Sequence, residues 1–358
     1  MRNLKGLVLS GGKGSRLRPF TYTGAKQLVP LANKPILFYA IEALVQAGID
    51  EIGVITGDTA EQVRDALGDG HTFGARITYI PQDAPSGIAH AVKIARPFLA
   101  DDPFVVFLGD NFLRGGIVPF VQAFRDSGAD AQILLTPVAN PRELGVAVLN
   151  DEGRPVRLVE KPPEPPSDLA IVGIYMFNRR FFEAVDQIQP SARGELEITD
   201  TIQQLIDLGA DVRAELVYDR WIDTGKMVDL LAANRIVLED LVPATAGATI
   251  EDSQLTGRVV IQPGARIVNS IIHGPAIVGE DTEVIDSFVG PYTSIYHHCR
   301  VTGTEIEASV VLERSVIDRP NNRIYESLIG RDVVVNGDDG KPKALRLVLG
   351  DHSRIQVP

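Results

Sequence analysis

A glycine-rich loop near the N-terminus combines backbone freedom with clustered positive charge. Residues 7–19 read LVLSGGKGSRLRP, so an apolar strand runs directly into the loop. Glycine lets backbone N–H groups approach anionic oxygens closely, and ammonium and guanidinium groups add charge. The residues with these properties are Gly11, Gly12, Lys13, Gly14, Arg16 and Arg18. The spacing matches neither the Walker loop nor the dinucleotide fingerprint. An ordinary strand-to-helix turn is the alternative, but the clustered arginines favour a triphosphate site.

Two aspartates follow apolar runs and could hold a divalent cation. FVVFLG is followed by Asp110 and Asn111, and the apolar stretch 217–222 leads to Asp223. In phosphate chemistry Mg²⁺ takes one or two carboxylates, and substrate oxygens and water complete its coordination. A single aspartate at such a position is typical of a turn or a helix cap. The two together, downstream of a phosphate loop, predict a magnesium site.

A second charged cluster begins with Glu160 and Lys161, which end a predicted strand at residues 155–160 and precede a proline-rich loop. The carboxylate would accept hydrogen bonds from sugar hydroxyls, and the lysine would offer a point charge to a phosphate. A solvated acid–base pair is the alternative. The segment RGELEITDTI is typical of a capped helix start, with charges that favour the first turn. Its charged residues are Arg193, Glu195, Glu197 and Asp200.

Short apolar runs alternate with helical segments over the first 240 residues. Besides the run near Leu9, strands are predicted at 51–56, 77–80, 104–108 and 131–137. Helices are predicted at 35–47, 60–67, 88–98 and 118–127. This alternation favours an α/β domain with a Rossmann-like, mixed and mostly parallel sheet covered on both faces. Ligands of such sheets gather at the carboxyl ends of the strands, where the glycine loop lies.

A 17-residue repeat replaces this alternation after the linker VPATAGA. Three sets of apolar residues recur at this spacing, together with one set of serines. They are Ile250, Ile267, Val284 and Val301; Leu255, Ile272, Val289 and Ile306; Ile261, Val278 and Ile295; and Ser253, Ser270 and Ser287. One triangular coil per repeat, with its aliphatic side chains stacked inward, predicts a parallel β-helix. The phase slips beyond Glu307, and NGDDG at 336–340 predicts a terminal hairpin turn.

Composition narrows the class of protein. The chain has 358 residues, 44% of them hydrophobic, and is long enough for two domains, predicted at 1–240 and 241–358. The net charge of −12 argues against broad binding of nucleic acid or anionic membranes. Apolar runs fall short of the roughly 18 residues that span a bilayer, and the N-terminus lacks a signal-peptide pattern. The single cysteine, Cys299, excludes an internal disulfide. A soluble, cytoplasmic protein is therefore expected.

Taken in order, these segments resemble the sugar-1-phosphate nucleotidyltransferases, and within that family the long form of the glucose-1-phosphate thymidylyltransferases. The resemblance covers nearly all of the chain and rests on GGKGSRLRP, AKQLVPLANKP, FLGDN, LGVAVL, VEKP, VGIYMF, GELEITD and WIDTG. It implies a nucleotidyltransferase domain followed by a left-handed β-helix, Mg²⁺ as cofactor, and dTTP and glucose 1-phosphate as substrates. The open end and flat faces of the coils predict capping or self-association, hence a homo-oligomer.

The resemblance also implies roles by position. Contacts with the nucleotide are implied for Leu9, Gly11, Gly12, Gly14, Ser15, Gln27, Gln82, Pro85 and Gly87. Contacts with the sugar phosphate are implied for Leu108, Asn111, Gly145, Glu160, Lys161, Val172 and Gly173. The implied catalytic residues are Arg16, Lys26, Asp110, Lys161 and Asp223, of which the two aspartates would carry Mg²⁺.

The implied reaction is in-line transfer of a nucleotidyl group. An oxygen of the sugar 1-phosphate attacks the α-phosphorus of the triphosphate, and pyrophosphate leaves. A phosphate monoester has a second pKa of about 6, so the nucleophile is already anionic and needs no general base. The first 240 residues contain only two histidines, His71 and His90, and neither lies in a motif. Mg²⁺, Arg16, Lys26 and Lys161 would offset the repulsion between the anions.

Three alternatives stay open on these residues. The choice between dTTP and UTP or another nucleoside triphosphate depends on one or two side chains. A non-catalytic subunit that senses nucleotide sugars would share the architecture but would be expected to lack one of the key charged residues, all of which are present. An acyltransferase site on the β-helix would use His297 and His298 as bases, although histidines at a turn are usually only a polar corner.

Overall fold

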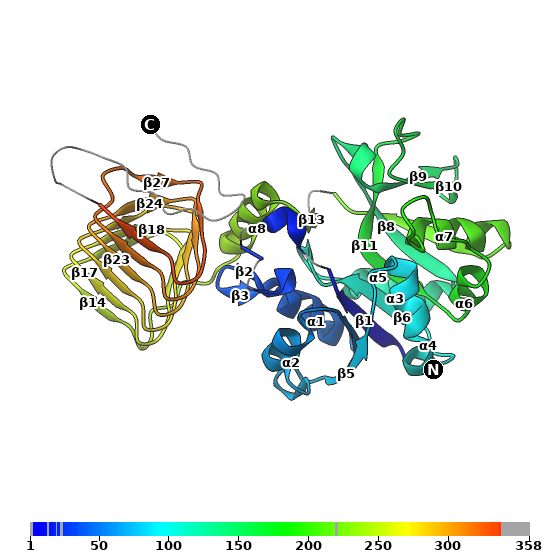
Figure 1. The fold of residues 1–358 in the computed structure, drawn as a ribbon, viewed down its shortest axis with the longest axis horizontal. Helices are drawn as coiled ribbons and strands as arrows, with labels where there is room; N and C mark the ends of the chain where they lie inside the picture. The colour runs from blue at the N-terminus through cyan, green and yellow to red at the C-terminus, as the bar shows by residue number, and fades with distance from the viewer. Residues whose placement is uncertain (1–2, 13, 19, 22–23, 219–220, 338–358) are drawn as a thin grey trace. The chain divides into compact units, whose positions relative to one another are not determined.

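The computed structural model of the chain describes residues 3–12, 14–18, 20–21, 24–218 and 221–337 (Figure 1). The chain divides into two compact units. The first unit comprises Met1–Lys13, Gly24–Leu28 and Ile36–Asp223, and the second comprises Gly14–Thr23, Val29–Pro35 and Thr224–Pro358. Two short segments near the N-terminus therefore belong with the C-terminal part of the chain.

A mixed sheet forms the centre of the first unit. Its strands are β1 (Lys5–Ser10), β4 (Glu51–Thr56), β5 (Arg76–Pro81), β6 (Phe104–Leu108), β8 (Ala131–Pro137), β9 (Gly145–Leu149), β10 (Pro155–Glu160), β11 (Leu169–Phe177) and β12 (Val212–Leu216). The main path runs β10-β9-β11-β6-β1-β4-β5, and β8 joins β11 to β12. Strands β5, β4, β1 and β6 are parallel, as are β8 and β12, whereas β11 is antiparallel to β6, β8 and β9. The predicted mixed α/β sheet is confirmed.

Helices cover both faces of this sheet (Figure 1). They are α1 (Ile36–Gln46), α2 (Ala60–Leu67), α3 (Ile88–Ile94), α4 (Arg96–Leu99), α5 (Val118–Ser127), α6 (Arg180–Val185) and α7 (Ile198–Asp207), with short 3-10 turns η2 (Lys26–Leu28), η3 (His71–Phe73) and η4 (Pro141–Glu143). Successive side chains of a strand point to opposite faces. Val8 therefore joins the core beneath α1, α2 and α5, and Leu7 joins the core beneath α3, α6 and α7.

One predicted helix is interrupted. The helix predicted at 88–98 is two helices, α3 and α4, which meet at Ala95. Pro97 lies in the first turn of α4, where its missing N–H costs no intrahelical hydrogen bond. Proline in the middle of a single helix would break the backbone hydrogen bonds, so the chain restarts there.

Asp223 belongs to a small ribbon of its own. Strand β13 (Trp221–Asp223) pairs antiparallel with β7 (Asn111–Leu113), which places Asp223 opposite Asn111. The prediction of one apolar run over 217–222 is wrong, because Val217 instead continues β12 and donates its N–H to Leu135 in β8. Pairing with β7 is what brings Asp223 next to the residues that follow β6.

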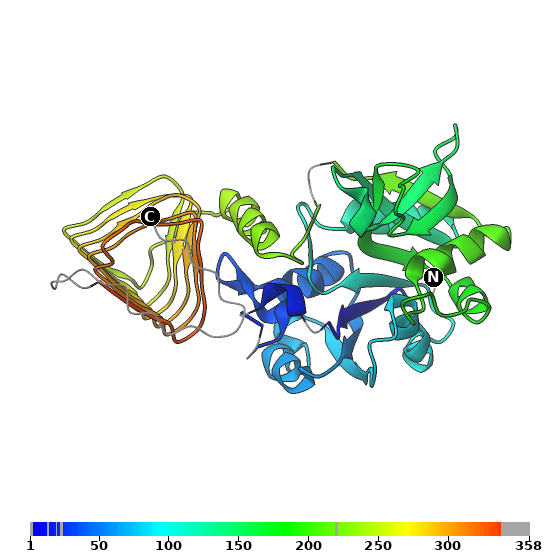
Figure 2. The same cartoon turned by 45° about the horizontal axis from the view of Figure 1, so that its top comes forward.

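The second unit is dominated by a parallel β-helix of triangular section (Figure 2). Its first sheet contains β14 (Thr249–Glu251), β17 (Arg266–Val268), β20 (Glu283–Ile285), β23 (Arg300–Thr302), β26 (Val316–Asp318) and β29 (Val334–Asn336). The second contains β15 (Gln254–Thr256), β18 (Ile271–His273), β21 (Phe288–Val289), β24 (Glu305–Glu307) and β27 (Ile324–Tyr325). The third contains β16 (Val259–Ile261), β19 (Ala276–Val278), β22 (Thr293–Ile295), β25 (Val310–Val311) and β28 (Leu328–Ile329). This architecture is consistent with the left-handed β-helix that was expected.

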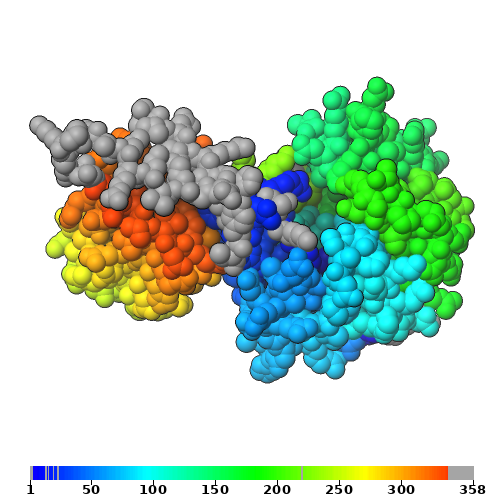
Figure 3. Space-filling model, in the orientation of Figure 1, coloured from blue at the N-terminus to red at the C-terminus, as the bar shows by residue number. Residues whose placement is uncertain are grey.

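The register of the coils follows the sequence repeat. Ile250 pairs with Ile267, Leu255 with Ile272, and Ile261 with Val278, in steps of one repeat. The side chains of Ile261, Ile267, Ile272 and Val278 and those of later coils form a continuous aliphatic core. Ile250, which was predicted to stack inward, is exposed, because it belongs to the first coil and only one neighbouring coil packs on it. The seam of serines is also confirmed, because the hydroxyl oxygen of each accepts the N–H of the residue one coil later, as in Ser253 with Ser270. Figure 3 shows successive coils, yellow to red, packed closely on the face seen there.

The phase slip is confirmed as well. Val301 pairs with Ile317, one residue short of a full repeat, and Ile317 pairs with Val335, one residue beyond it. The polar hairpin predicted at 336–340 lies for the most part outside the described residues, which end at residue 337.

Four further elements complete the second unit. They are η1 (Ser15–Leu17), the hairpin strands β2 (Pro30–Leu31) and β3 (Lys34–Pro35), and α8 (Met227–Glu239). Helix α8 groups with the β-helix in the second unit. The domain boundary at residue 240 stays a prediction. No helix among the described residues combines the length and the hydropathy needed to cross a bilayer.

Candidate active site

The loops after β1 and β4 meet at the carboxyl end of the sheet. A Cβ on Gly57 would lie 3.0 Å from the carbonyl oxygen of Gly11, and a Cβ on Gly11 would lie 3.2 Å from Oε1 of Gln82. Nε2 of Gln27 lies 3.5 Å from the point that a Cβ on Gly12 would occupy. Glycine suits positions where backbones approach this closely. Four residues with implied nucleotide contacts are therefore neighbours at one edge.

Gly87 is held against the segment that precedes α7. Its φ of 103° disfavours other residues, and a Cβ would lie 2.3 Å from the carbonyl oxygen of Leu196. Leu196 also donates its N–H to Ser86 at 2.8 Å. The neighbouring Pro85 is exposed, and Leu9, which precedes the glycine loop, is half-buried. A substituent on Gly87 would push these two segments apart, which explains why this position needs glycine.

The remaining residues with implied nucleotide contacts belong to the second unit. Gly14, with a φ of 60°, accepts the N–H of Leu17 at 3.0 Å and the hydroxyl of Thr21 at 2.6 Å. Ser15 begins η1, and Arg16 in the same turn is exposed. The loop is therefore an ordered turn that presents its arginine to solvent. Lys13 lies outside the described residues.

Lys26 lies between the two aspartates that were predicted to hold a cation. The ammonium of Lys26 donates a short hydrogen bond to Oδ2 of Asp110 and lies 3.9 Å from Oδ1 of Asp223. The lysine side chain is 7% exposed, whereas those of Asp110 and Asp223 are 23% and 30% exposed. Both carboxylates thus converge on one point and remain accessible from solvent.

Two opposing effects set the ionisation of Asp110. Burial raises the pKa of its carboxyl, but the charge and hydrogen bond of Lys26 and the hydrogen bond from Asn111 lower it, and the net shift is downward. The group is therefore ionised at neutral pH.

These two carboxylates suit a hard divalent cation, which prefers oxygen ligands and keeps open positions for phosphate. No set of three or more His, Cys, Asp or Glu side chains in the described part of the chain is arranged to hold an ion. A cation at this point would therefore share its coordination with substrate.

Asn111 connects the residue that follows β6 to the ribbon that carries Asp223. Its Nδ2 donates to Oδ1 of Asp110 at 2.9 Å, and its Oδ1 accepts the indole N–H of Trp221 at 2.6 Å. A Cβ on Gly173 would lie 2.5 Å from this Oδ1 and 2.6 Å from Cδ1 of Leu108. Asn111 is almost fully buried, and both the nitrogen and the oxygen of its amide have a partner. It therefore orients Asp110, and its own contact with a sugar phosphate stays a prediction.

Glu160 lies at the centre of a second cluster. Its Oε1 accepts from Arg193 at 3.2 Å, and its Oε2 accepts from the hydroxyl of Thr199 at 3.2 Å. A Cβ on Gly145 would lie 3.0 Å from the same Oε2. Arg193 also makes a bidentate pair with Glu197, both distances being 2.8 Å. The structure thus links the end of β10 to the start of α7, a connection that the charged helix start did not indicate.

Lys161 follows Glu160 in a strained conformation. Its φ is 40°, a region that residues other than glycine rarely adopt, and its N–H donates to Leu144 at 3.1 Å. The side chain is 44% exposed, and its Nζ lies 3.4 Å from Oε1 of Glu160. Strain of this kind tends to occur at functional sites. By contrast, the side chain of Val172 is buried in the core, so only its backbone is available for the contact implied for it.

Several polar residues near the glycine loop were missed by the motifs. Ser10 and Thr56 are cross-strand neighbours at the ends of β1 and β4, and their buried hydroxyls have no hydrogen-bond partner among the residues that the structure describes. The same is true of Oε1 of Gln27. His90 lies 3.1 Å, nitrogen to nitrogen, from Nε2 of Gln82. The rule that identified Asp110, a polar residue at a parallel strand end, would also have identified Ser10 and Thr56.

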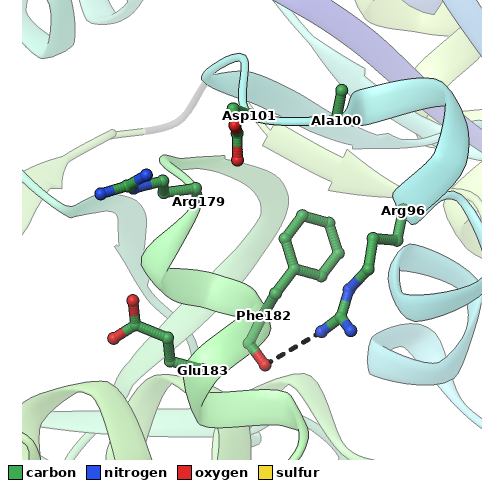
Figure 4. Close-up of a pocket in the computed structure, with 6 residues that line it drawn as sticks. All are labelled: Arg96, Ala100, Asp101, Arg179, Phe182 and Glu183. Carbon is green, nitrogen blue, oxygen red and sulfur yellow. Dashed lines mark hydrogen bonds between the residues drawn. The ribbon is translucent and has the colours of Figure 1, made fainter.

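A shallow hollow between α4 and α6 is separate from these residues. It has a volume of about 440 Å³ and is lined by Arg96, Ala100, Asp101, Arg179, Phe182 and Glu183 (Figure 4). Its central guanidinium, that of Arg96, donates to the carbonyl of Phe182 and to Asp186 and stacks on the Phe182 ring. The hollow therefore contains both positive and negative side chains, and Arg96 is already paired within the protein.

His297 of the β-helix is not available as a base. Nδ1 of His297 accepts the N–H of Glu280 at 2.9 Å, so the neutral ring carries its proton on Nε2 and has no free lone pair. Burial lowers the pKa of His297. His298 is exposed, with Nδ1 3.7 Å from Asp281. Both histidines are therefore polar corner residues, and the acyltransferase alternative is not favoured.

Comparison with known proteins agrees with this geometry. The sequence model of the nucleotidyl transferase family matches residues 5–240. Glucose-1-phosphate thymidylyltransferases of Streptomyces antibioticus and Streptomyces griseus are 53% and 50% identical, each over 99% of both chains. A Bacillus anthracis structure that carries the provisional name glucose-1-phosphate thymidylyltransferase, solved with sucrose, has a TM-score of 0.62 and 36% identity over 68% of this chain and 98% of its own.

The chain therefore belongs to the nucleotidyl transferase family, whose members generally use a divalent metal ion. It is a nucleotidyltransferase, and the two Streptomyces relatives that match over nearly their whole length are named glucose-1-phosphate thymidylyltransferases.

Proposed function

We propose that this protein transfers a thymidylyl group from dTTP to glucose 1-phosphate, which yields dTDP-glucose and pyrophosphate. The observation that carries the proposal is the convergence of Asp110 and Asp223 on the ammonium of Lys26, next to the glycine loop. The names of the two Streptomyces relatives, each matched over 99% of its length, support the choice of substrates.

We infer that Mg²⁺ is the metal and that Asp110 and Asp223 hold it. When bound, the ion would neutralise phosphate charge and polarise the α-phosphoryl group. The lowered pKa of Asp110 keeps that ligand ionised at neutral pH. Lys26 is buried between the acids, so its ammonium is preorganised for the phosphates of the nucleotide.

The nucleotide would bind at the edge formed by Gly11, Gly12, Gln27 and Gln82. Backbone N–H groups of the glycines would contact phosphate oxygens, and Gln82 would contact the base. The partnerless Oε1 of Gln27 supports its assignment to the sugar of the nucleotide, because a buried acceptor gains a hydrogen bond when a hydroxyl reaches it. The contact with the nucleotide phosphates that was predicted for Arg16 stays part of this proposal.

The hexose phosphate would bind at the second cluster. Glu160, oriented by Thr199 and Arg193, would accept hydrogen bonds from sugar hydroxyls, and Lys161 would contact the phosphate. This phosphate is already largely dianionic at neutral pH, so its oxygen can attack without a protein base. His90 is hydrogen-bonded to Gln82, a residue predicted to contact the nucleobase. This pairing is consistent with a reaction that uses no general base from the protein.

We also propose that the protein works in the cytoplasm as a homo-oligomer. A parallel β-helix presents flat strand faces and an open end, and such edges favour capping or association. Analytical ultracentrifugation of the full chain would test this state, and a single monomeric species at micromolar concentration would contradict it.

A pyrophosphate-release assay across dTTP, UTP, ATP, CTP and GTP tests the function, with glucose, galactose, mannose and N-acetylglucosamine 1-phosphates and Mg²⁺. We expect the highest kcat/KM for dTTP with glucose 1-phosphate. Preference for UTP would replace the nucleotide assignment. Release with none of the pairs would leave a binding subunit as the function.

A further inference from the structure

A strained hairpin turn follows the segment that carries Lys26 and Gln27. Strands β2 and β3 are joined by Ala32 and Asn33, whose φ angles are 45° and 61°. A two-residue turn of this kind requires positive φ at both positions, which asparagine tolerates and which alanine adopts only with strain. Strained backbone persists only where its surroundings determine it. The contacts that hold this turn are therefore informative.

Asn234 of α8 is the first of these contacts. Its Oδ1 accepts the N–H of Ala32 at 2.8 Å and the hydroxyl of Ser294 in β22 at 2.9 Å. Its Nδ2 lies 3.4 Å from the carbonyl oxygen of Tyr292. The Asn234 side chain is fully buried. One amide thus joins the hairpin, α8 and a coil of the β-helix.

Asn33 makes the second connection. Its Nδ2 donates to the carbonyl oxygen of Ile295, the last residue of β22, at 2.7 Å. Ala32 packs in a small apolar cluster with Leu238 of α8 and Ile277 of β19. The turn is therefore held by the β-helix through both backbone and side-chain contacts, which compensates for its strain.

The segment Gly14–Thr23, which carries Arg16, also lies near the β-helix. Phe20 lies 4.0 Å from the point that a Cβ on Gly330 would occupy. Gly330 directly follows β28. Both short segments that join the second unit, Gly14–Thr23 and Val29–Pro35, thus lie near coils of the β-helix.

We propose that Asn234 and Asn33 are positioning residues for nucleotide binding, through which the β-helix anchors the hairpin that follows Lys26 and Gln27. The inference rests on the proposed function of those two residues. It assigns the β-helix an indirect part in catalysis, because the β-helix fixes the chain on one side of the catalytic lysine. The carboxylate of Glu160 is instead held by Arg193 and Thr199, which are far from the hairpin in sequence, so we expect the sugar-phosphate cluster not to depend on this anchor.

Steady-state kinetics of three variants tests the proposal. Asn33→Gly keeps a residue that accepts positive φ but deletes the amide, and Asn234→Ala deletes the shared amide of α8. The matched control is Ser287→Ala, which removes a buried hydroxyl that accepts the N–H of Thr304 in the serine seam, away from the hairpin. We expect both asparagine variants to raise KM for dTTP and to lower kcat by on the order of 10–100-fold, as misplacement of a catalytic group by about 1 Å does. KM for glucose 1-phosphate should stay unchanged, and Ser287→Ala should match wild type in all three constants.

The split between the two KM values separates positioning from mere stability. Equal rises in KM for both substrates, or wild-type kinetics in Asn33→Gly, would overturn the proposal about the anchor. Neither result would contradict the proposed function of the wild-type protein. If the wild-type protein makes no dTDP-glucose, the proposed function fails instead. Hydrogen–deuterium exchange then still tests whether the β-helix anchors the hairpin. Faster amide exchange at residues 25–28 in Asn33→Gly and Asn234→Ala, but not in Ser287→Ala, would support the anchor. Unchanged exchange in the two asparagine variants would refute it.

Discussion

The buried ammonium of Lys26 is hydrogen-bonded to the carboxylate of Asp110. The two residues are 84 positions apart in the chain, on η2 and directly after β6. This pair, with Asp223 beside it, concentrates one fixed positive charge and two negative charges at the carboxyl end of the sheet. Such an arrangement can receive both a metal ion and a polyphosphate.

Lys26→Met tests the preorganised charge. The apolar side chain fills a similar volume but leaves Asp110 and Asp223 without their shared cation. We expect kcat to fall on the order of 10²–10³-fold, as when one fixed contact to developing charge is lost. Stopped-flow or steady-state pyrophosphate release measures it. Lys93→Met, which removes a surface ion pair with Asp186, is the matched control and should retain activity.

The pH dependence of stability tests the pairing of Asp110. Its pKa is lower in the folded protein than the usual value of about 3.9, so the pair stabilises the fold above that pH. The contribution is lost as pH falls through the lowered pKa. Urea unfolding of wild type and Asp110→Asn between pH 3 and pH 7 should therefore show a difference in unfolding free energy that shrinks below about pH 4. A difference that grows on acidification would exclude the assigned direction.

Asp223→Asn tests the metal site. The amide keeps the shape of the side chain but lacks the charge that attracts a hard cation. We expect the Mg²⁺ concentration for half-maximal rate to rise on the order of tenfold or more, in line with the loss of a charged ligand. Chelation of divalent ions should abolish turnover in wild type, and added Mg²⁺ should restore it. Asp126→Asn, on the exposed face of α5, serves as the control, and an equal shift in that variant would remove Asp223 from the site.

Two substitutions at Lys161 separate its charge from its backbone strain. Both Lys161→Ala and Lys161→Gly delete the ammonium, so both should raise KM for glucose 1-phosphate. Only glycine adopts a φ of 40° without strain. The free energy of unfolding of Lys161→Gly should therefore be about 1 kcal/mol higher than that of Lys161→Ala. Chemical denaturation and kinetics of the two proteins provide the comparison. Wild-type KM in both variants would take Lys161 out of the sugar-phosphate site.

Local sequence patterns predicted most of the elements. The strands at 51–56 and 104–108 and the helices at 60–67 and 118–127 have the predicted bounds, because each is set by the periodicity of its own apolar residues. The β-helix could also be predicted from the sequence, because stacked coils repeat one pattern of residues at a constant spacing. Patterns of this kind reflect which side of a segment faces a core, and they need no knowledge of the partner.

Contacts between distant segments were decided by the tertiary structure alone. Sequence suggested Asp110, Asp223 and Lys26 separately, but the β7–β13 ribbon and the turn η2 bring them to one point. The link from Arg193 to Glu160, and the anchoring of the strained turn at Ala32 by Asn234, have no local signature either. A side chain's partner depends on where the backbone carries other residues, whereas its own periodicity depends only on its neighbours in the chain. The amino-acid sequence therefore determined the elements, the coil repeat and the types of charged group, and the folded chain decided which of those groups meet.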